Sequence, residues 1–418
     1  MACGLVVVGL GYVGLPLART AGAAGIPVTG LDVSERVVTG LRSGRSHIED
    51  VTDQDVKGIL AAGFDATTDP AVLADAETVA ICVPTALGAD RAPDLGPLVR
   101  ASTTVAGHLR PGALVVVEST SYPGTTSEVI RPILEGTGLV AGDDFCLAYS
   151  PERIDPGRRT FGIHNTPKVV SGHTRACAKR CAAFYERFVD TVVIARGTRE
   201  AEMAKLLENT YRNVNIALVN EFAMYCDRLG VDVWDVLRCA ATKPFGFQPF
   251  RPGAGVGGHC IPVDPAYLMH KASSEGFTFK VVAAAQQVNQ DMPAHVARRV
   301  AGLLADAGRP VRGAQVLLLG VSYKPDVADL RESPAIAVAQ QLAELGAQTL
   351  FHDPHVARLD VDGTPLRRAD HPYEAAAHAD ISVLLHAHRA YDLDRLGRSA
   401  RLLFDATGRA RGERVVRL

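Results

Sequence analysis

No stretch of the sequence has the length and uniformity of a membrane span. The N-terminal apolar run from Leu5 to Leu10 contains Gly9 and lacks the basic flank of a secretory signal. The run from Val311 to Val321 carries Arg, Gly and Gln and is shorter than the roughly 20 apolar residues that cross a bilayer. These absences predict a cytoplasmic protein without a membrane partner.

The net charge is also small, and cysteines are few. The formal net charge of −2 gives no broad electrostatic reason to bind nucleic acid or anionic lipid. The eight cysteines are scattered, and the helical pair Cys177 and Cys181 lacks the second pair that a zinc site needs. We therefore expect no metal site and no structural disulfide, with most thiols buried as small apolar side chains.

What the sequence does contain is a pattern of short β-like runs alternating with helical segments, which is typical of βαβ units. Strand candidates in the first part are residues 5–8, 27–31, 78–83 and 113–118. Strand candidates return at residues 315–319, 349–352, 381–385 and 402–404. Between these parts, residues 202–229 lack proline and glycine and repeat apolar residues every three or four positions. That segment predicts one long helix, ending near Gly230.

These patterns predict an α/β fold with two parallel-sheet domains joined by a central helical domain. At roughly 150 residues per domain, a chain of 418 residues makes two or three domains. We place an N-terminal domain at residues 1–199, the helical domain at 200–305 and a C-terminal domain at 306–418.

The run Val8-Gly9-Leu10-Gly11-Tyr12-Val13-Gly14 follows the first strand candidate and opens a helix. In such a loop Gly9 allows a tight turn, Gly11 lets a pyrophosphate approach the backbone, and Gly14 lets the helix pack on the strand. Asp32 ends the next strand candidate, where a carboxylate bonds the ribose hydroxyls and repels a 2′-phosphate. The loop therefore predicts NAD as the cofactor, in preference to NADP or to an ordinary βα turn.

Two further loops follow predicted strands. They are Val83-Pro84-Thr85 and Glu118-Ser119-Thr120. Ligands of open α/β sheets bind beyond the carboxyl ends of the strands, so Pro84, Thr85, Ser119 and Thr120 are candidates for the cofactor cleft. An ordinary structural role in the turn after each strand explains these four residues equally well.

The most informative stretch starts at Phe250-Arg251-Pro252 and ends at His259-Cys260, with four glycines in six residues between them. Glycines leave backbone N–H groups uncovered, which suits a loop that wraps an anionic or sugar group. The loop ends in one thiol, and Asp264 follows four residues later. A thiol beside cations acts as a nucleophile, whereas the alternative is a buried, inert cysteine. Because alcohol oxidation alone needs no thiol, a nucleophilic Cys260 implies a thioester route to an acid.

Three more residues carry suitable chemistry. Lys205 and Asn209 are four apart and share one face of the long predicted helix, where the lysine can stabilise an oxyanion. A solvated lysine beside a polar patch fits the spacing equally well. Glu152, in Tyr149-Ser150-Pro151-Glu152-Arg153, follows a strand-like run and is a candidate acid/base.

Along essentially its full length the chain resembles the UDP-glucose/GDP-mannose dehydrogenase family. Gly9-Leu10-Gly11-Tyr12-Val13-Gly14-Leu15-Pro16 is similar to the cofactor loop of that family, and Gly257-Gly258-His259-Cys260 to its nucleophile loop. Ser322-Tyr323-Lys324-Pro325-Asp326 and Leu330-Arg331-Glu332-Ser333-Pro334 resemble its C-terminal signatures. The resemblance implies Rossmann-like N- and C-terminal domains.

The resemblance also implies an NAD-dependent four-electron oxidation of the C6 hydroxyl of a UDP-sugar. The alcohol becomes an aldehyde, Cys260 adds to it, and a second oxidation gives a thioester that water hydrolyses. By matched positions, Lys205 stabilises oxyanions and Asp264 works with a bound water. Glu152 and Thr120 then handle protons and hydrolysis.

The resemblance further implies the binding residues and the assembly. Asn209, Tyr323 and Lys324 contact the substrate, and Arg331 contacts NAD. Further residues that match substrate contacts of the family are Glu152, Arg153, Ile154, Lys205, Phe250, Arg251 and Gly257. The C-terminal domain carries UDP, and the long helix mediates a homodimer. The alternative for Lys324 and Arg331 is a surface salt bridge, typically below about 1 kcal/mol.

Three motifs resemble the family branch that acts on UDP-N-acetylhexosamines. They are Ser150-Pro151-Glu152-Arg153-Ile154-Asp155-Pro156-Gly157, Leu207-Glu208-Asn209-Thr210-Tyr211-Arg212 and Lys243-Pro244-Phe245-Gly246-Phe247. His259 and Val263-Asp264 also differ from the small residue and Lys-Asp of the UDP-glucose branch. UDP-N-acetylglucosamine is therefore the expected substrate, followed by UDP-N-acetylmannosamine and UDP-glucose. Arg251 departs from the aromatic residue that this branch often has, which puts the exact sugar in question.

Two rival hypotheses are open at this stage. A β-hydroxyacid dehydrogenase also joins a dinucleotide-binding domain to a helical domain, but needs neither Cys260 nor a C-terminal α/β domain. A catalytically inactive nucleotide-binding regulator would bind NAD without turnover. A Cys260→Ala substitution separates these cases, because only the nucleotide-sugar enzyme depends on the thiol.

Overall fold

The computed structural model describes residues 3–88, 91–154 and 160–418, which divide into two compact units. Unit 1 comprises residues 1–208 and 266–277, and unit 2 comprises residues 209–265 and 278–418. The motif residues Asp155, Pro156 and Gly157 lie outside the described part of the chain.

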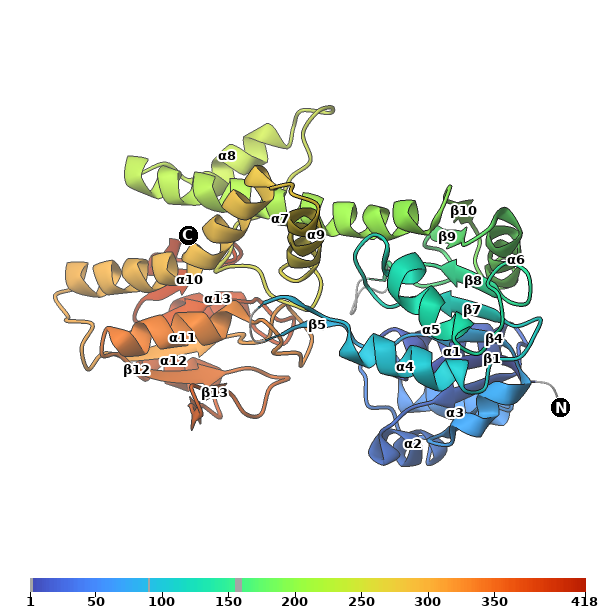
Figure 1. Ribbon diagram of the computed structural model, residues 1–418. Coiled ribbons are helices and arrows are strands. Elements are labelled where there is room, and N and C mark those ends of the chain that lie inside the picture. Colours follow the sequence, from blue (N-terminus) through green and yellow to red (C-terminus); the bar gives the residue numbers. More distant parts are fainter. Residues whose placement is uncertain (1–2, 89–90, 155–159) are drawn as a thin grey trace. The chain divides into compact units, whose positions relative to one another are not determined.

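Within its described residues, unit 1 is built on an eight-stranded sheet in the order β10-β9-β8-β7-β4-β1-β2-β3 (Figure 1). Its strands are β1 (Cys3–Val8), β2 (Val28–Leu31), β3 (Asp65–Thr67), β4 (Ala76–Ile81), β7 (Leu114–Val117), β8 (Cys146–Tyr149), β9 (Lys168–Gly172) and β10 (Val192–Ile194). Neighbours pair in parallel except β8 and β9, which are antiparallel. The carboxyl ends of β9 and β10 therefore lie at the opposite edge of the sheet from those of β1, β4, β7 and β8.

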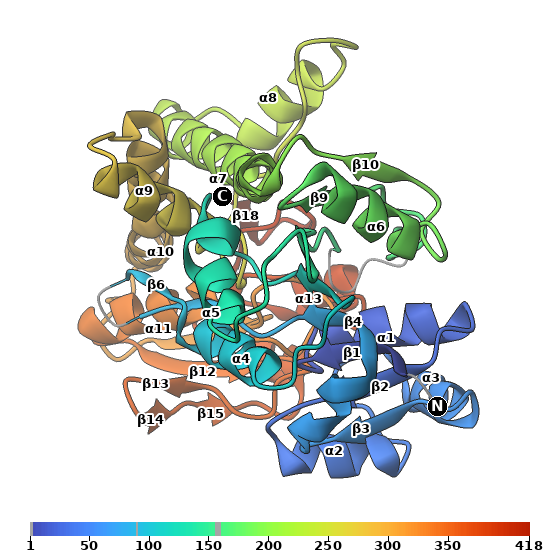
Figure 2. The ribbon, with the colours of Figure 1, turned by 45° about the vertical axis from the view of Figure 1, so that its right-hand side comes forward.

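Helices cover both faces of this sheet. Alternate residues of β1 face opposite sides, with Leu5 and Val7 in one core cluster and Val6 and Val8 in another. The first cluster includes α1 (Gly14–Ala23), α2 (Glu35–Arg42), α3 (Asp53–Ala61) and α6 (Arg175–Tyr185). The second includes α4 (Gly96–Ala106), α5 (Arg131–Glu135) and two irregular helices, η1 (Pro70–Asp75) and η2 (Thr125–Ile130) (Figure 2). A short hairpin, β5 (Ala86–Leu87) and β6 (Pro93–Asp94), lies outside the sheet.

Unit 2 holds a six-stranded parallel sheet in the order β15-β12-β11-β16-β17-β18 within the part of the chain described. The strands are β11 (Gln315–Leu319), β12 (Gln348–His352), β15 (Arg367–Arg368), β16 (Ile381–Leu384), β17 (Leu403–Asp405) and β18 (Val415–Arg417). α10 (Lys280–Asp306) and α11 (Pro334–Glu344) cover one face, and α12 (Pro372–His378) and α13 (Leu393–Ser399) cover the other. A small hairpin, β13 (Asp360–Val361) and β14 (Thr364–Pro365), completes this unit.

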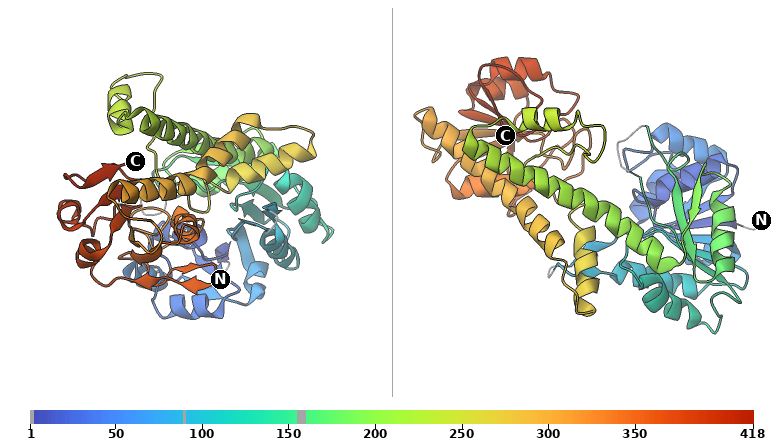
Figure 3. Two further views of the ribbon diagram at one scale, coloured as in Figure 1. Left: turned by 90° about the vertical axis from the view of Figure 1, so that its left-hand side faces the viewer. Right: turned by 90° about the horizontal axis from the view of Figure 1, so that it is seen from above.

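The long helix is α7 (Thr198–Leu229), which passes from unit 1 into unit 2 and ends just before Gly230 (Figure 3). It is followed by α8 (Val233–Ala240), and α9 (Asp264–Ser274) returns the chain to unit 1. The two largely parallel sheets and the long helix α7 confirm the predicted α/β fold class. The predicted strands match the observed ones to within two residues at each end.

Candidate functional site

The glycine loop after β1 has the geometry that a dinucleotide requires. A Cβ on Gly9, whose φ is +93°, would lie 2.8 Å from the carbonyl oxygen of Cys82. A Cβ on Gly14 would lie 1.8 Å from the carbonyl oxygen of Gly9, so the first and third glycines are required by packing. A Cβ on Gly11 would meet nothing within 4 Å, which leaves space where a pyrophosphate can approach. The loop therefore fits NAD.

Asp32 lies directly after β2 and anchors this loop. Its carboxylate accepts hydrogen bonds of 2.9 Å from the backbone N–H groups of Leu10 and Ser34. The N-cap residue of α1 is Val13, whose side chain makes no capping hydrogen bond, and a helix start of this kind suits the negative charge of a phosphate. Tyr12 and Val13 are half-buried against the core. A carboxylate held beside the glycine loop suits a ribose diol.

The loops after β4 and β7 are joined to each other. The Ser119 hydroxyl donates to the Val83 carbonyl at 2.8 Å, and the Ser119 N–H donates to Ile81 at 3.2 Å. Thr85 is buried, while Pro84 is exposed and Thr120 half-buried. The carboxyl ends of these strands and of β1 meet at one edge of the sheet, as ligand binding in this type of fold requires.

A buried charge cluster, which the sequence did not reveal, lies behind Ser119. Glu118 accepts a 2.6 Å bond from the Lys168 ammonium and a short one from the Tyr185 hydroxyl, and none of the three side chains is appreciably exposed. Burial lowers the pKa of Lys168, but the carboxylates of Glu118 and Glu152 outweigh it and hold that pKa above its usual value. The lysine thus keeps its charge beside the Glu118 carboxylate. The partners of Glu118 are 50 and 67 residues away in sequence, which hides them from motif reading.

Lys205 and Glu152 meet in unit 1. The Lys205 ammonium donates to the backbone carbonyl of Glu152, whose own carboxylate accepts from the N–H of Ile154. Lys205 is only 7 % exposed, so the alternative of a solvated surface lysine is wrong. Arg153 forms a 2.8 Å ion pair with Glu208 and donates to the carbonyl of Pro167.

Glu202, one turn before Lys205 on α7, is a second buried carboxylate that sequence reasoning missed. It accepts hydrogen bonds from the backbone N–H groups of Gly124 and Thr126 and from the Thr126 hydroxyl, at 2.6 to 2.8 Å. Burial outweighs these bonds and raises the pKa of Glu202 to about 7. The side chain ties α7 to the segment that follows Thr120.

In unit 2 the nucleophile loop, defined here as residues 250–263, ends where α9 begins. Cys260 is exposed, and its carbonyl accepts from the Asp264 N–H at 2.9 Å, which places the two residues one turn apart. Asp264 is 1 % exposed, and its carboxylate accepts from the Asn209 side-chain amide at 2.5 Å. The exposed thiol, the buried carboxylate and the helix α7 amide are thus brought together.

The glycines of this loop serve close packing. A Cβ on Gly258, whose φ is +89°, would lie 2.7 Å from the ring of Tyr323, and one on Gly257 would lie 2.7 Å from the carbonyl oxygen of Glu332. The Gly258 N–H donates to the Arg331 carbonyl at 3.0 Å. The expectation that these glycines leave their N–H groups uncovered is therefore wrong for Gly258. The loop packs instead on both C-terminal signature motifs.

The remaining predicted contacts are at the surface of unit 2. Phe250 packs edge-on against Tyr211 at 5.8 Å between ring centroids, and Arg251 is exposed. The Lys324 ammonium lies 5.7 Å from the Tyr323 ring centroid. Arg331 makes a 2.6 Å ion pair with Asp329 two residues away, which is the local salt bridge considered as an alternative to a ligand contact.

Asp353, after β12, organises the carboxyl edge of the unit 2 sheet. Its carboxylate accepts from the N–H groups of Val321 and Ser322 at 2.8 and 3.1 Å and pairs with His388 Nε2 at 2.9 Å. Burial would raise the pKa of Asp353, but the bonds from His388 and backbone groups outweigh burial and lower it to about 2. The segment leading to Tyr323 is thereby fixed.

A possible metal cluster of Asp326, His355 and His388 adjoins this network, with ligand atoms within 4.8 Å of one another. Both ring nitrogens of His388 are already engaged, because Nδ1 accepts from the Asp326 N–H at 2.8 Å and Nε2 pairs with Asp353. The chemistry of the donors therefore fits a hydrogen-bond network better than a metal site.

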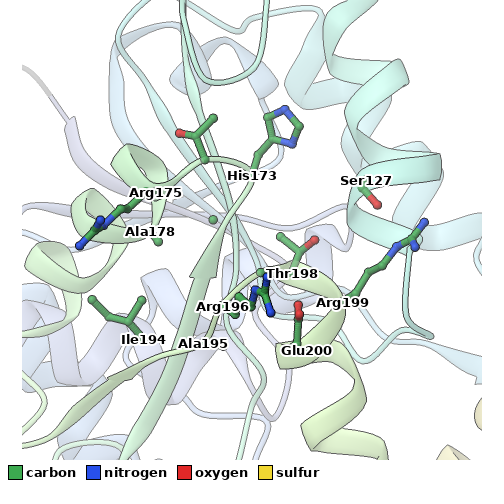
Figure 4. A pocket seen from close by; sticks show the side chains of 13 residues that line it. Ser127, His173, Arg175, Ala178, Ile194, Ala195, Arg196, Thr198, Arg199 and Glu200 are labelled. Carbon is green, nitrogen blue, oxygen red and sulfur yellow. The ribbon is translucent and has the colours of Figure 1, made fainter.

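A pocket of about 560 Å³ lies in unit 1 around the start of α7 (Figure 4). Its lining includes His173, Arg175, Arg196 and Arg199 and excludes every predicted site residue. It adjoins the carboxyl ends of β9 and β10, at the sheet edge opposite the glycine loop. This pocket is therefore separate from the predicted NAD site.

Among the described helices, none is both long enough and apolar enough to cross a membrane.

Comparison with known protein families identifies matches along most of the chain. Three domain models of the UDP-glucose/GDP-mannose dehydrogenase family match in order along the sequence. They are the NAD binding domain at residues 3–189, the central domain at 199–291 and the UDP binding domain at 317–409.

Individual relatives agree with the family match. The UDP-N-acetyl-D-glucosamine 6-dehydrogenase of Pseudomonas aeruginosa is 37% identical over 96% of this chain and 95% of its own length. The UDP-N-acetyl-D-mannosamine dehydrogenase of Yersinia pestis is 35% identical over 92% of this chain and 93% of its own. The solved UDP-D-ManNAc dehydrogenase of Pyrococcus horikoshii superposes with a TM-score of 0.89 and 33% identity, covering 99% of this chain and 98% of that one. The chain therefore belongs to the UDP-glucose/GDP-mannose dehydrogenase family and is an NAD-dependent oxidoreductase of nucleotide sugars.

Proposed function

We propose that the protein oxidises UDP-N-acetylglucosamine to UDP-N-acetylglucosaminuronate through a thioester on Cys260. The observation that carries this proposal is the exposed Cys260 thiol one turn from the buried Asp264 carboxylate, which Asn209 holds. The N-acetylhexosamine-type motifs favour an N-acetylated sugar, and a relative named UDP-N-acetyl-D-glucosamine 6-dehydrogenase is 37% identical over 96% of this chain. UDP-N-acetylmannosamine is the second candidate, because relatives named as dehydrogenases of that substrate are 35% to 37% identical to the chain.

The reaction divides into two oxidations and a hydrolysis. When bound, NAD supplies a hydride acceptor for each oxidation. The C6 alcohol loses a hydride and a proton to give an aldehyde, and the Cys260 sulfur then adds to the aldehyde carbon. Loss of a second hydride from the resulting thiohemiacetal gives a thioester. Water displaces Cys260 from the acyl carbon, so that the product is the carboxylate and the thiol is regenerated.

The chain's own residues hold charge and protons in these steps. The Lys205 ammonium stabilises the oxyanions at C6, in a buried setting where such a charge acts strongly. Asp264 holds a water, Glu152 and Thr120 take up and return protons, and Asn209 positions the substrate. Lys205, Asn209 and Asp264 are all buried polar residues, and the bonds from Lys205 to the Glu152 carbonyl and from Asn209 to Asp264 hold them in place, which supports this assignment.

Binding is assigned in the same proposal to separate parts of the chain. The NAD contacts are assigned to the following residues: Gly9, Gly11, Tyr12, Val13, Gly14, Asp32, Pro84, Thr85, Ser119, Thr120 and Arg331. The UDP-sugar contacts are assigned to Glu152, Arg153, Ile154, Lys205, Asn209, Phe250, Arg251, Gly257, Tyr323 and Lys324. The division into domains 1–199, 200–305 and 306–418 is part of the same proposal.

We also propose a homodimer formed through α7. Large apolar side chains are exposed along this helix, and they share one face at spacings of three, four and seven residues. They are Met203, Leu207, Tyr211, Leu218, Phe222, Tyr225 and Leu229, which together we call the apolar stripe. A stripe of this length is unusual on a solvated helix and supports an interface between two copies.

The test is the number of NADH molecules released per sugar by the purified protein. NAD would be supplied with UDP-N-acetylglucosamine, UDP-N-acetylmannosamine, UDP-glucose or GDP-mannose. Two NADH per UDP-N-acetylglucosamine, lost in Cys260→Ala and retained in Cys239→Ala, would support the proposal, since Cys239 is the matched exposed cysteine on α8. Turnover on another sugar alone would overturn the substrate and keep the mechanism. One NADH per sugar, or activity retained without the Cys260 thiol, would overturn the thioester route.

A further inference from the structure

Both ends of the nucleophile loop are tied to buried asparagines of α7. The Gly253 N–H donates to Asn220 Oδ1 at 3.0 Å, near the start of the loop. The Asn213 side-chain amide donates to the carbonyl of Ile261 at 3.2 Å, directly after Cys260. Asn213 is 1 % exposed and Asn220 is 0 % exposed. The thiol therefore lies between two fixed points of the loop.

Asn289 on α10 connects these two points. The Asn220 amide donates to Asn289 Oδ1 at 2.9 Å, and the Asn289 amide donates to the backbone carbonyl of Asn213 at 3.1 Å. The Gly253 N–H, which only an oxygen of Asn220 can accept, sets the orientation of the Asn220 and Asn289 amides, and the Ile261 carbonyl, which can only accept, sets that of Asn213. Four hydrogen bonds thus run in one direction from Gly253 to Ile261, between the packed helices α7 and α10 (Figure 3).

The asparagines of α7 that contact the loop segment lie along one face of that helix. Asn209, Asn213 and Asn220 follow at intervals of four and seven residues, which brings them to one side of α7. Asn209 bonds Asp264 just after the loop, so the same face contacts the loop segment at three places. A core would gain more from apolar residues at these positions, because buried amides add little net stability beyond satisfying each other. Their partners indicate a role in the geometry of the loop.

We propose that Asn213, Asn220 and Asn289 are positioning residues that hold the Cys260 thiol where it can add to the aldehyde. This inference rests on the proposed function of Cys260. The first oxidation involves no thiol, so loosening the loop impairs the addition step specifically. The aldehyde then leaves before it is captured, and the NADH released per sugar falls from two toward one.

The experiment compares Asn213→Ala and Asn220→Ala with Asn215→Ala. Asn215 is the matched control, because its amide donates to the Tyr211 carbonyl within α7 at 2.7 Å rather than to the nucleophile loop. Asn213→Ala is expected to fold, since the Asn213 Oδ1 atom has no partner among the described residues and truncation removes it. NADH per sugar, aldehyde trapped by hydroxylamine, and the KM for NAD would be measured for each.

Both loop variants are expected to release trappable aldehyde and to lose acid formation by on the order of tenfold to a hundredfold, with the KM for NAD unchanged. Asn215→Ala is expected to behave like the wild type. Loop variants that match Asn215→Ala in NADH per sugar would overturn the proposal. A loss spread equally over both oxidations would overturn it as well, because a merely structural role predicts that pattern.

Two measurements keep the test independent of turnover. Alkylation of Cys260 by iodoacetamide, followed by mass spectrometry, should be faster in both loop variants than in Asn215→Ala. In the wild type, the Gly253 amide should exchange slowly with deuterium because its partner is buried. Fast exchange at Gly253 together with equal alkylation rates would refute the positioning role. If Cys260→Ala retained acid formation, the proposed function would fail instead, whatever these two rates showed.

Discussion

The Asn209 side-chain amide donates a 2.5 Å hydrogen bond to the Asp264 carboxylate, and both residues are more than nine-tenths buried. Asn209 lies in the middle of α7, and Asp264 is the first residue of α9, one turn after Cys260. The pair therefore fixes the only carboxylate in this turn at a defined distance from the nucleophile.

Asn209→Asp should replace this hydrogen bond by two carboxylates in contact. Two buried like charges cannot both stay ionised, so one must bind a proton or the pair must separate. We expect turnover at pH 7 to fall about a hundredfold and the free energy of unfolding to fall by roughly 2–4 kcal/mol. Urea unfolding and rates between pH 5 and 9 measure both effects. Asn215→Asp, half-exposed on the same helix, is the control, and an equal loss in both variants would refute the prediction.

Lys168→Met should leave the Glu118 carboxylate buried without its cation. Breaking a buried pair from one side costs roughly 3–5 kcal/mol, because the remaining charge is uncompensated. Replacing both partners, as Lys168→Met with Glu118→Gln, should recover a large part of this loss. Chemical denaturation of the two variants measures the difference. Equal stabilities of the single and double variants would show that Glu118 does not depend on Lys168.

Glu202 should make stability depend on pH in the neutral range. Its pKa is raised from 4.5 to about 7 in the folded protein, so the folded state holds a proton that the unfolded chain releases. The contribution of Glu202 to the free energy of unfolding is fully present below pH 4.5. It is lost as the pH rises through 7, by roughly 3 kcal/mol in total. Denaturant midpoints from pH 5 to 8 would show the slope. Glu202→Gln should flatten it, and an unchanged slope in that variant would assign the pH dependence to another group.

Phe222→Glu should separate the proposed dimer. Phe222 is 51 % exposed within the apolar stripe, and a charge buried in an apolar interface without a partner is strongly unfavourable. Light scattering after size exclusion should show the wild type as a dimer and the variant as a monomer. Arg212→Glu, an exposed substitution off the stripe, should leave the dimer intact. A wild type that is already monomeric would contradict the assignment of α7.

Local patterns made the fold and the cofactor loop predictable. The strand at Gln315–Leu319 was found to the residue, because an apolar run between turn residues defines it without tertiary information. The long helix was expected over residues 202–229 and begins four residues earlier, at Thr198, but its periodicity could not predict that Leu207, Leu218 and Phe222 would be exposed. Apolar spacing looks the same for a core and for an interface.

Long-range partners account for what the sequence did not reveal. Glu118 was noticed only as part of a loop, since Lys168 and Tyr185 reach it from a different strand and helix. Asn213, Asn220 and Asn289 carry no motif, although polar residues at helical spacing on the buried side of α7 are a usable signal. The glycines of the nucleophile loop were read as ligand-binding, whereas contact with Tyr323 explains Gly258.

The return of α9 to unit 1 has a consequence for synthesis on the ribosome. Tyr267 is fully buried and donates to the Ala86 carbonyl at 2.9 Å, and Lys271 pairs with Glu128, so residues 266–277 complete a unit that otherwise ends at residue 208. Domains generally fold as the chain emerges, N-terminal part first. Here the first unit must wait until 57 residues of the second (209–265) have been translated. A nascent chain arrested before residue 266 should therefore remain sensitive to protease at Ala86.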